Sequence, residues 1–338
     1  MNQTELVATA SALVAPGKGI LAADESTSTV QKRFEKFHLA ATEANRRTYR
    51  ELLFTTVGAA EFISGAILYD ETIRQQAQDG RFFPSVLSEQ GIMPGIKADT
   101  GLEPLAGCPG EQITKGLDDL RSRLEEYHRL GARFAKWRGV IHIGAGLPSQ
   151  SALAANAHAL ARYAALCQEI DIVPIVEPEV LMDGDHTLAA CEAATTATLH
   201  HVFAQLIAMN VLLEGIVLKP NMVLPGKQHP HQATPAQIAE ATLRCFRRAV
   251  PAAVPGIAFL SGGQSPQEAT VNLNAMNIGE PQPWALTFSY GRALQEPVLQ
   301  TWQGQPENRE AAQRAYLQRA RCNSAACMGI YTPAMEQS

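Results

Sequence analysis

The sequence predicts an α/β fold, a single closed (β/α)8 barrel in which eight parallel strands alternate with helices. Short apolar runs alternate with helix-length segments along the chain, and there are eight such runs. No low-complexity tract, charge block or long Pro/Gly/Ser linker divides the 338 residues. Repeated strand–helix–strand units imply parallel pairing with right-handed crossovers. Eight units over about 300 residues favour a closed barrel over the alternative, an open doubly wound sheet.

Each apolar run is predicted to form one barrel strand. In chain order, the runs are 19–24, 66–70, 91–99, 133–141, 171–180, 215–223, 255–264 and 283–292. Several intervening segments carry apolar residues three and four positions apart, the spacing of one helix face. The clearest are Leu117, Leu120, Leu124, Tyr127 and Leu130, and then Leu199, Val202, Phe203, Leu206 and Ile207. We therefore expect one catalytic domain over residues 1–338, with a short C-terminal tail at about 334–338.

The composition excludes several classes of protein. Hydrophobic residues make up 46% of the chain and charged residues 18%, which supports a large core and disfavours disorder. The formal charge of −5 is too small to indicate nucleic-acid binding. Residues 1–15 are apolar but too short to span a bilayer, and they lack the basic start of a secretory signal. We expect a soluble cytoplasmic protein that binds neither membranes nor nucleic acids.

Familiar cofactor and metal motifs are incomplete. The six cysteines include no Cys-x-x-Cys pair, which is typical of buried, unbridged thiols in a reducing compartment. Gly144-Ala-Gly146 lacks the third glycine of a dinucleotide fingerprint, and the Gly-Lys pairs at 17–18 and 226–227 lack the Ser/Thr of a P-loop. The histidines at 200–201, 229 and 231 lack the spacing and carboxylate partners of a catalytic zinc site. We therefore expect no metal and no cofactor.

Charged residues gather at the carboxyl ends of six predicted strands. They are Asp24, Lys97 with Asp99, Lys136 with Arg138, Glu177 with Glu179, Lys219, and Arg292; a seventh strand ends in Ser261-Gly262-Gly263. A lone buried ion costs several kcal/mol unless it is paired. The carboxyl-terminal mouth of a barrel is where such groups converge on a ligand and on each other. The alternative is that each charged residue merely marks where its strand emerges into solvent. The presence of such residues at six strand ends disfavours this alternative.

Two of these strands carry complementary charged pairs. Side chains two positions apart share a strand face, so Lys136 lies beside Arg138, and Glu177 lies beside Glu179. If both pairs face the lumen, two cations meet two anions there. This arrangement satisfies the charges and shifts their pKa values.

Lys219 is the candidate nucleophile. It ends an apolar run and precedes Pro220, which lacks the next ladder donor, so the strand should stop there. Burial beside a second ammonium lowers the pKa of an amine. A lowered pKa leaves part of the amine neutral, which is the condition for Schiff-base formation. The alternative is a snorkelling lysine. Only eight lysines accompany twenty arginines, and this scarcity, with the nearby carboxylates, favours the nucleophile.

The last two strands carry a phosphate-binding pattern. Ser261-Gly262-Gly263 and Ser289-Tyr-Gly291-Arg292 combine glycines, whose backbone N–H groups can approach an anion, with an arginine clamp. This quarter of a barrel is a frequent phosphate site. The pattern predicts a phosphorylated small-molecule substrate.

Seven motifs, in order, resemble the class I fructose-1,6-bisphosphate aldolase family from about residue 19 to residue 333. They are Leu-Ala-Ala-Asp24-Glu-Ser26, Gly-Ile-Lys97, Phe-Ala-Lys136-Trp-Arg138, Val-Glu177-Pro-Glu179, Leu-Lys219-Pro-Asn-Met, Leu-Ser261-Gly-Gly-Gln-Ser and Thr-Phe-Ser289-Tyr-Gly-Arg292-Ala-Leu. The resemblance implies a metal-independent TIM barrel, usually a homotetramer, that acts in glycolysis and gluconeogenesis. It implies reversible cleavage of fructose 1,6-bisphosphate to dihydroxyacetone phosphate and glyceraldehyde 3-phosphate.

The resemblance also implies a role for each candidate site residue. Lys219 attacks the ketone to form a Schiff base, and Glu177 is the general acid and base. Asp24 orients or helps to deprotonate the hydroxyl on the fourth carbon, Lys136 keeps Lys219 partly neutral, and Glu179 holds the lysines in place. The phosphate on the first carbon is expected at Ser261, Gly262, Gly263, Ser289, Gly291 and Arg292. The opposite phosphate is expected at Ser26, Thr29 and Lys97, with Arg33 nearby, and Arg138 is a further phosphate-binding candidate.

Two departures from the family pattern carry expectations of their own. Ser28 replaces a family glycine, and this loss of an easy positive φ is expected to reshape the second phosphate site. Five residues follow Pro333, whereas many family members carry a longer tail ending in a tyrosine that aids proton exchange on the enamine. Tyr331 matches an earlier family position. From this we expect slower release of dihydroxyacetone phosphate with cleavage retained.

Three alternative functions remain open at this stage. The same chemistry could prefer sedoheptulose 1,7-bisphosphate or fructose 1-phosphate. A non-catalytic scaffold is disfavoured because the lysines and glutamates of the site are intact. A metal-dependent aldolase is disfavoured because the ligand motifs are missing.

Overall fold

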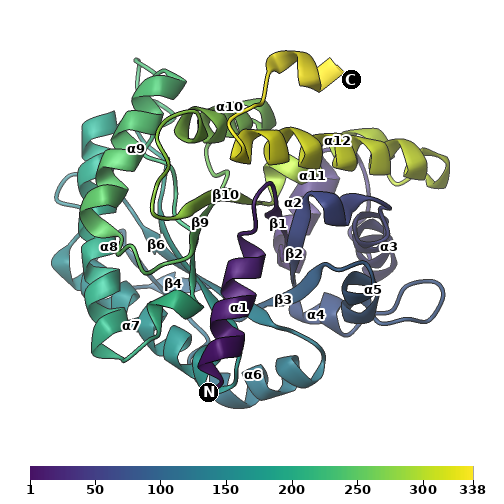
Figure 1. Ribbon diagram of the computed structural model, residues 1–338, viewed down its shortest axis with the longest axis horizontal. Coiled ribbons are helices and arrows are strands. Elements are labelled where there is room, and N and C mark those ends of the chain that lie inside the picture. The colour runs from purple at the N-terminus through teal and green to yellow at the C-terminus, as the bar shows by residue number, and fades with distance from the viewer. Residues whose placement is uncertain (338) are drawn as a thin grey trace.

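The computed structural model describes residues 1–337 and contains a closed barrel of eight parallel strands (Figure 1). The barrel strands are β1 (Gly19–Ala23), β2 (Ile63–Leu68), β3 (Met93–Lys97), β6 (Phe134–Ile141), β7 (Val173–Val180), β8 (Val217–Leu218), β9 (Gly256–Phe259) and β10 (Ala285–Tyr290). Their order around the barrel is β1-β10-β9-β8-β7-β6-β3-β2. Strands β4 (Leu102–Pro104) and β5 (Gln112–Thr114) form a separate antiparallel pair after β3. The predicted (β/α)8 barrel is confirmed.

Helices surround the barrel, as Figure 1 shows. They are α1 (Gln3–Leu13), α2 (Thr27–Glu35), α3 (Glu43–Phe54), α4 (Asp70–Ile73), α5 (Phe83–Glu89), α6 (Leu120–Arg129), α7 (Gln150–Glu169), α8 (Leu188–Ala208), α9 (Pro235–Ala249), α10 (Pro266–Asn277), α11 (Arg292–Trp302) and α12 (Arg309–Cys327). Local sequence fixes where several of them begin. Thr234 and Ser265 each form a capping box before a proline at the first helical position of α9 and α10.

Most predicted strand bounds agree with the structure to within a few residues; β8 and β9 each end five residues before the predicted run, and the second strand is displaced toward the N-terminus. It begins at Ile63 rather than at residue 66, and Asp70 opens α4 instead of ending the strand. The helix patterns at 117–130 and 199–207 correspond to α6 and α8, although Ile207 is exposed.

The ladder of β8 is shorter than the predicted run 215–223 because Pro220 and Asn221 end it. Pro220 has no N–H to donate, as the sequence predicts. The Asn221 side chain accepts a hydrogen bond from Val180 N at 2.9 Å, so it takes the place of a backbone partner for β7. Lys219 N still donates to Val176 O at 2.8 Å, which anchors Lys219 at the strand end.

The amino-terminal half of the lumen is a dry apolar core. It contains Leu6, Ala10, Leu13 and Val14 from α1 and its end, together with Ile20, Ala22, Ile67, Phe134, Val173, Ile175, Val217 and Ala258 from the strands. In Figure 1, α1 crosses in front of the strands. The Phe134 ring requires glycine opposite it, because a Cβ on Gly95 would stand 2.3 Å from that ring. Helix α1 therefore closes this end, and the other end remains for the site.

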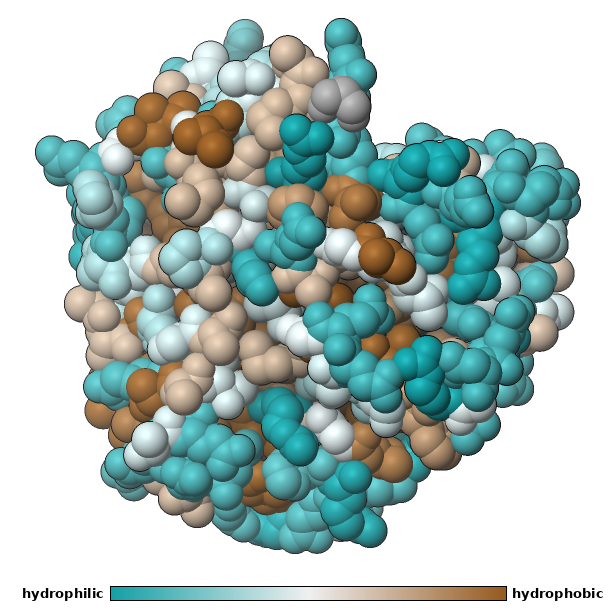
Figure 2. All heavy atoms as spheres, turned by 45° about the vertical axis from the view of Figure 1, so that its right-hand side comes forward, coloured by the Kyte–Doolittle hydropathy of each residue, from teal (hydrophilic) through white to brown (hydrophobic). Residues whose placement is uncertain are grey.

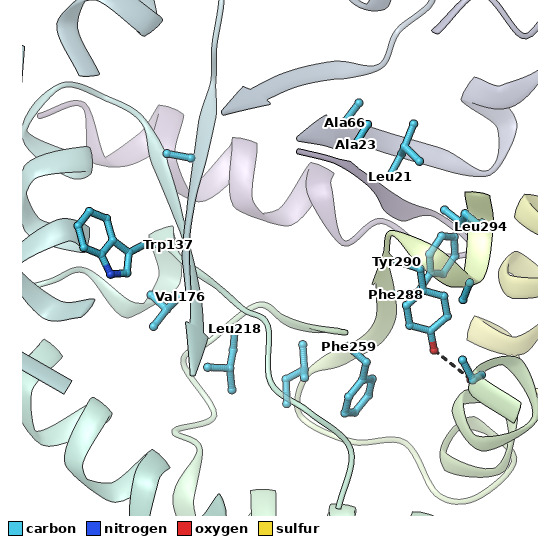
Figure 3. Packing of buried hydrophobic residues seen from close by; sticks show 14 of the residues in the cluster. Leu21, Ala23, Ala66, Trp137, Val176, Leu218, Phe259, Phe288, Tyr290 and Leu294 are labelled. Carbon is cyan, nitrogen blue, oxygen red and sulfur yellow. Dashed lines mark hydrogen bonds between the residues drawn. The ribbon is translucent and has the colours of Figure 1, made fainter. Parts of the chain in front are cut away.

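The outer faces of the strands pack against the helices. Figure 3 shows Trp137, Val176, Leu218, Phe259 and Tyr290 among the side chains of this layer. The Trp137 ring stacks on the Tyr163 ring of α7 at 5.5 Å. Trp137 thus points outward between two residues that point inward, which confirms the predicted alternation around it.

The barrel closes where the first and last strands meet. Ile20 pairs with Ser289 and Leu21 pairs with Tyr290. The C-terminal segment Pro333–Gln337 forms a 3-10 turn that packs back on α12 through an ion pair between Arg319 and Glu336. Tyr331 donates a hydrogen bond to Glu336 at 2.9 Å. The expected tail at 334–338 is therefore packed on the barrel as far as residue 337, and Ser338 lies outside the described residues.

The surface shows no large apolar face in the view of Figure 2, where hydrophobic groups are small and separated by polar ones. Within residues 1–337, no helix has the length and apolar character needed to cross a membrane. The six cysteines are unbridged in this part of the chain.

Candidate active site

A cavity of about 700 Å³ opens at the carboxyl ends of the barrel strands. Every residue that the sequence singled out for the site lines it. These residues are Asp24, Ser26, Thr29, Arg33, Lys97, Lys136, Arg138, Glu177, Glu179, Lys219, Ser261, Gly262, Gly263, Ser289, Gly291 and Arg292. They come from all parts of the chain. The prediction that the strand ends converge on one cavity is therefore confirmed.

The cavity is electropositive although the chain is acidic. Nine of its lining residues are Lys or Arg and six are Asp or Glu, whereas the whole chain has a formal charge of −5. A concave site with an excess of one charge concentrates ligands of the opposite charge. The cavity therefore favours a small anion with more than one negative group.

The Glu177 carboxylate stands between two lysines at the base of the cavity. Its Oε1 lies 3.2 Å from Lys219 Nζ, and its Oε2 lies 3.4 Å from Lys136 Nζ. All three residues are 4% exposed. One buried carboxylate thus contacts both amines, a spacing that allows proton transfer with either.

Lys136 is the centre of the charge network. Its Nζ lies 2.8 Å from Asp24 Oδ2 and 3.7 Å from Asp99 Oδ2, in addition to its contact with Glu177. Asp99 also contacts Lys97, with 3.4 Å between Oδ1 and Nζ. The network therefore runs from Lys97 through Asp99 and Lys136 to both Asp24 and Glu177.

Burial and charge pairing act in opposite directions on these pKa values. Burial opposes ionisation of Asp24 and Glu177, but the cations around them outweigh it, so both carboxyl pKa values are lowered. Burial also opposes the charged form of Lys136. Asp24, Glu177 and Asp99 outweigh that effect, and the pKa of Lys136 is raised. The ground state of the site therefore holds ionised Asp24 and Glu177 around a Lys136 ammonium.

Glu179 differs from the expectation that it holds the lysines. Its carboxylate forms an ion pair with the Arg138 guanidinium on the neighbouring strand. The carboxylates in contact with Lys136 are instead Asp24, Asp99 and Glu177, and Lys219 contacts Glu177. A role for Glu179 in holding the lysines stays a prediction, and the ion pair with Arg138 is the contact that could transmit it.

The glycine-rich end of the cavity is built from the turns after β9 and β10. Gly291 precedes the first residue of α11, so this helix N-terminus faces the cavity beside Ser289. Ser289 Oγ is buried and has no hydrogen-bond partner within residues 1–337. Arg292 Nη2 donates to Gln264 O at 2.8 Å, which ties the two turns together. Backbone N–H groups, a hydroxyl and a guanidinium thus converge on one spot, the donor set that a phosphate takes.

The opposite end of the cavity is formed by α2 and the turn before it. Ser26 Oγ lies 3.1 Å from Thr29 Oγ1 and 3.1 Å from Ser28 Oγ. The Arg33 guanidinium forms an ion pair with Glu25, so part of its charge is already balanced. These hydroxyls and Arg33 lie at an N-terminal helix turn, a second region suited to an anion.

Ser28 needs no left-handed backbone in this structure, and its expected effect on the second phosphate site stays a prediction. Ser28 lies in the first turn of α2 and has no positive φ. Because helical backbone suits any ordinary residue, Ser28 is unstrained where it lies.

The comparisons with known proteins agree with this geometry. The family model described as "Fructose-bisphosphate aldolase class-I" matches residues 5–338. The chain belongs to this family. It is an aldolase, an aldehyde-lyase, and it shares 54% identity over 330 residues with a probable class 1 fructose-bisphosphate aldolase of Xanthomonas campestris pv. campestris, covering 97% of this chain and 99% of that one.

Two further relatives extend the similarity beyond bacteria. Cytosolic fructose-bisphosphate aldolase 4 of Arabidopsis thaliana is 52% identical over 328 residues, which cover 97% of this chain and 84% of that protein. The structure of fructose-bisphosphate aldolase from Plasmodium falciparum, in a ternary complex with TRAP and a small-molecule inhibitor, superposes with a TM-score of 0.96. Its sequence identity is 50%, with 97% of this chain and 95% of that chain covered.

Six charged residues that line the aldolase cavity lie outside the predicted set of site residues, and two of them are Glu25 and Asp183. Asp99 joins the lysine network, while Lys32, Lys36 and Lys227 line the cavity. The positions of Lys32 and Lys36, one helical turn apart beside Arg33, are a signal that could have placed them on one face of α2. Lys227 follows β8 in an irregular loop, so no periodic pattern points to it.

A resident metal is not indicated by the clustering of side chains in this aldolase. Within the described part of the chain, residues 1–337, no group of three or more His, Cys, Asp or Glu side chains could hold a metal ion. Metal independence stays a prediction, to be tested with a chelator.

Proposed function

We propose that this aldolase reversibly cleaves fructose 1,6-bisphosphate through a Schiff base on Lys219, in glycolysis and gluconeogenesis. The observation that carries the proposal is the buried Glu177 carboxylate, which contacts Lys219 Nζ at 3.2 Å and Lys136 Nζ at 3.4 Å. It supplies a proton acceptor and donor at the amine that must become the nucleophile. Dihydroxyacetone phosphate and glyceraldehyde 3-phosphate are the products.

In the first half-reaction, the neutral Lys219 amine attacks the ketone carbon of the substrate. As the C–N bond forms and the C=O π bond breaks, the ketone oxygen takes one proton from solvent and becomes the carbinolamine hydroxyl. Glu177 accepts a second proton from the attacking nitrogen and passes it to this hydroxyl, which leaves as water. The resulting iminium is positively charged, and ionised Glu177 beside it stabilises that charge. Lys136, held as an ammonium, helps to position the carbinolamine oxygen.

In the second half-reaction, the bond between the third and fourth carbons breaks. Glu177 takes the proton of the hydroxyl on the fourth carbon, and Asp24, paired with Lys136 at 2.8 Å, orients this hydroxyl or helps to remove its proton. The carbonyl of glyceraldehyde 3-phosphate forms, and the bonding electrons neutralise the iminium to give an enamine. Protonation of the third carbon and hydrolysis then release dihydroxyacetone phosphate and regenerate the Lys219 amine.

The two ends of the cavity are assigned to the two phosphates. We infer that the phosphate on the first carbon binds at Ser261, Gly262, Gly263, Ser289, Gly291 and Arg292. The other phosphate binds at Ser26, Thr29, Lys97 and Arg33, and Arg138 contributes positive charge. In support, all eleven residues line the same cavity, and the Ser289 hydroxyl has no hydrogen-bond partner within residues 1–337.

Borohydride reduction in the presence of dihydroxyacetone phosphate tests the Schiff base. We expect one stable adduct per chain, and peptide mapping should place it on Lys219. The Lys219→Met variant should lose the adduct, whereas the control Lys227→Met, which removes a lysine at the rim of the same cavity, should retain it at saturating ligand. An adduct that survives Lys219→Met refutes the assignment.

Two comparisons separate the remaining alternatives. The cleavage rates of fructose 1,6-bisphosphate, sedoheptulose 1,7-bisphosphate and fructose 1-phosphate, measured at matched saturation, identify the preferred ketose. Dialysis against EDTA should leave the rate unchanged, and loss of activity that added zinc restores would revive a metal-dependent mechanism.

We also infer a cytoplasmic homotetramer. The family resemblance supports the tetramer, and the Arabidopsis relative that is named cytosolic supports the compartment. Sedimentation velocity at micromolar concentration should give a tetramer, and cell fractionation should recover the protein with cytoplasmic markers. A monomer by sedimentation, or recovery in a membrane fraction, contradicts the corresponding inference.

A further inference from the structure

Lys227 occupies a rigid position at the rim of the cavity. Its loop, which follows β8, is joined to the loop after β7 by three backbone hydrogen bonds, and Lys227 N donates the central one to Met182 O at 2.9 Å. The flanking bonds run from Gly226 N to His186 O at 2.8 Å and from Gln228 N to Gly184 O at 2.9 Å. The backbone of Lys227 is therefore fixed on both sides, while its side chain is 49% exposed.

The side chain of Lys227 extends over the glycine-rich turn. A Cβ built on Gly263 would stand 3.6 Å from Lys227 Cε, so the stem lies directly against this turn. Lys227, Gly262 and Gly263 all line the same cavity. The terminal ammonium is thus within side-chain reach of an anion held between Ser261 and Arg292.

The present partner of Lys227 is easily exchanged. Its Nζ lies 3.1 Å from Asp183 Oδ1, and the Asp183 side chain is 70% exposed. Exposed pairs of this kind contribute little to stability because water screens them. A phosphate carries more charge than a carboxylate and offers three acceptor oxygens, so it competes well for the ammonium.

We propose that Lys227 is a further substrate-binding residue of this aldolase: it leaves Asp183 when substrate binds and donates to the phosphate held by Ser261, Gly262 and Arg292. Asp183 then acts as a competitor that lowers phosphate affinity. The inference rests on the proposed function, which places the phosphate of the first carbon at this turn. It adds a contact from the loop after β8, on the side away from α11.

The position of Lys227 makes the expected effect specific to one phosphate. The opposite end of the cavity has its own cations, Lys32 on α2 and Lys36 at the C-cap of that helix. Loss of Lys227 should therefore weaken fructose 1,6-bisphosphate, fructose 1-phosphate and dihydroxyacetone phosphate by the same factor, since all three carry the phosphate on the first carbon.

Steady-state kinetics of Lys227→Met provide the first test. We expect KM for both sugars to rise about three- to tenfold with kcat within about twofold, because the lost contact forms on binding and is retained in the transition state. The matched control is Lys18→Met, which removes one positive charge before the amino end of β1 and should leave KM unchanged. The KM effect should shrink at high salt, as for any half-exposed charge pair.

A double-mutant cycle with Asp183→Asn provides the second test. Alone, Asp183→Asn should lower KM, because Lys227 no longer has a competing carboxylate; in the Lys227→Met background it should have no effect. An unchanged KM in Lys227→Met, or an Asp183→Asn effect that persists without Lys227, overturns the proposal. A KM change for fructose 1,6-bisphosphate alone also overturns it, because the contact then belongs to the other phosphate.

Binding measurements keep this inference separate from the function on which it rests. Calorimetric titration of dihydroxyacetone phosphate needs no turnover, and its affinity should fall about three- to tenfold in Lys227→Met. Failure of the unmodified enzyme to cleave any of the sugars contradicts the proposed function. Cleavage with unaltered affinity in the variant contradicts only the role of Lys227.

Discussion

Glu25→Gln should destabilise the fold more than any exposed charge substitution. The Glu25 side chain is 7% exposed, and its Oε2 lies 2.7 Å from Nη2 of Arg50, which is 3% exposed. Glu25 also forms an ion pair with Arg33 and accepts a hydrogen bond from Gln295 Nε2 at 2.7 Å. One carboxylate in the wall of the cavity thus joins α2, α3 and α11.

The magnitude follows from the charge that the substitution leaves behind. Loss of the carboxylate leaves the Arg50 guanidinium buried without its counter-ion, which costs about 3–5 kcal/mol. Unfolding entropy is about 2.1 cal/mol/K per residue, and the chain has 338 residues. The midpoint of thermal unfolding should therefore fall by about 4–7 °C.

Urea unfolding followed by circular dichroism measures the effect at neutral pH. The matched control is Glu240→Gln, since Glu240 is 75% exposed and pairs with Arg244 at 2.9 Å. It should cost less than about 1 kcal/mol. A Glu25→Gln variant as stable as this control refutes the reasoning.

The pH dependence gives an independent check. Burial opposes ionisation of Glu25, but Arg50 and Arg33 outweigh it and lower its pKa below the ordinary 4.5. A carboxyl with a depressed folded-state pKa contributes its full stability above 4.5 and loses it as the pH falls toward the folded value. The stability gap between wild type and Glu25→Gln should be constant above pH 4.5 and narrow below it. A gap that is unchanged well below pH 4.5 contradicts this account.

Three further predictions concern the site and the barrel. Lys136→Met should lower kcat by about 10²-fold or more, because it removes the cation that pairs with Asp24 and Glu177, and a coupled assay of fructose 1,6-bisphosphate cleavage at equal folded fraction measures this. Phe134→Ala should lower the free energy of unfolding by about 3–5 kcal/mol, since it empties the middle of the lumen, and an unchanged urea midpoint rules out that packing role. Ser28→Gly should destabilise by about 0.5–1 kcal/mol, because the position is helical, and a stabilising effect in the same urea assay would restore the positive-φ interpretation.

The parts of the fold and site that the sequence predicts are those that follow from strand periodicity. Lys136 and Arg138 share an inward face because side chains alternate along a strand, and the same rule places Glu177 and Glu179 opposite them. The register between the two strands, Arg138 beside Glu177, brings the charges together. Pro220 predicts the end of its strand for an equally local reason, the missing donor.

The parts that the sequence does not predict depend on contacts between distant segments. Asp99 lies past the end of β3, and its direction is set by the hydrogen bond from Ala98 N to Lys136 O. No alternation rule extends into that turn. Glu25 and Gln295 are 270 residues apart in the sequence, so their hydrogen bond forms only when the barrel is closed and no local pattern predicts it.

Because the seam between β1 and β10 joins the two ends of the barrel sequence, we expect the active site to form late in folding. Asp24 follows the first strand, whereas Ser289 and Arg292 belong to the last strand and the helix after it. Contacts of such long sequence separation form slowly, because the intervening chain must be ordered first. A nascent or truncated chain that ends before β10 lacks one phosphate cradle and one wall of the lumen. We expect such a chain not to turn over substrate, so that activity reports on completed closure.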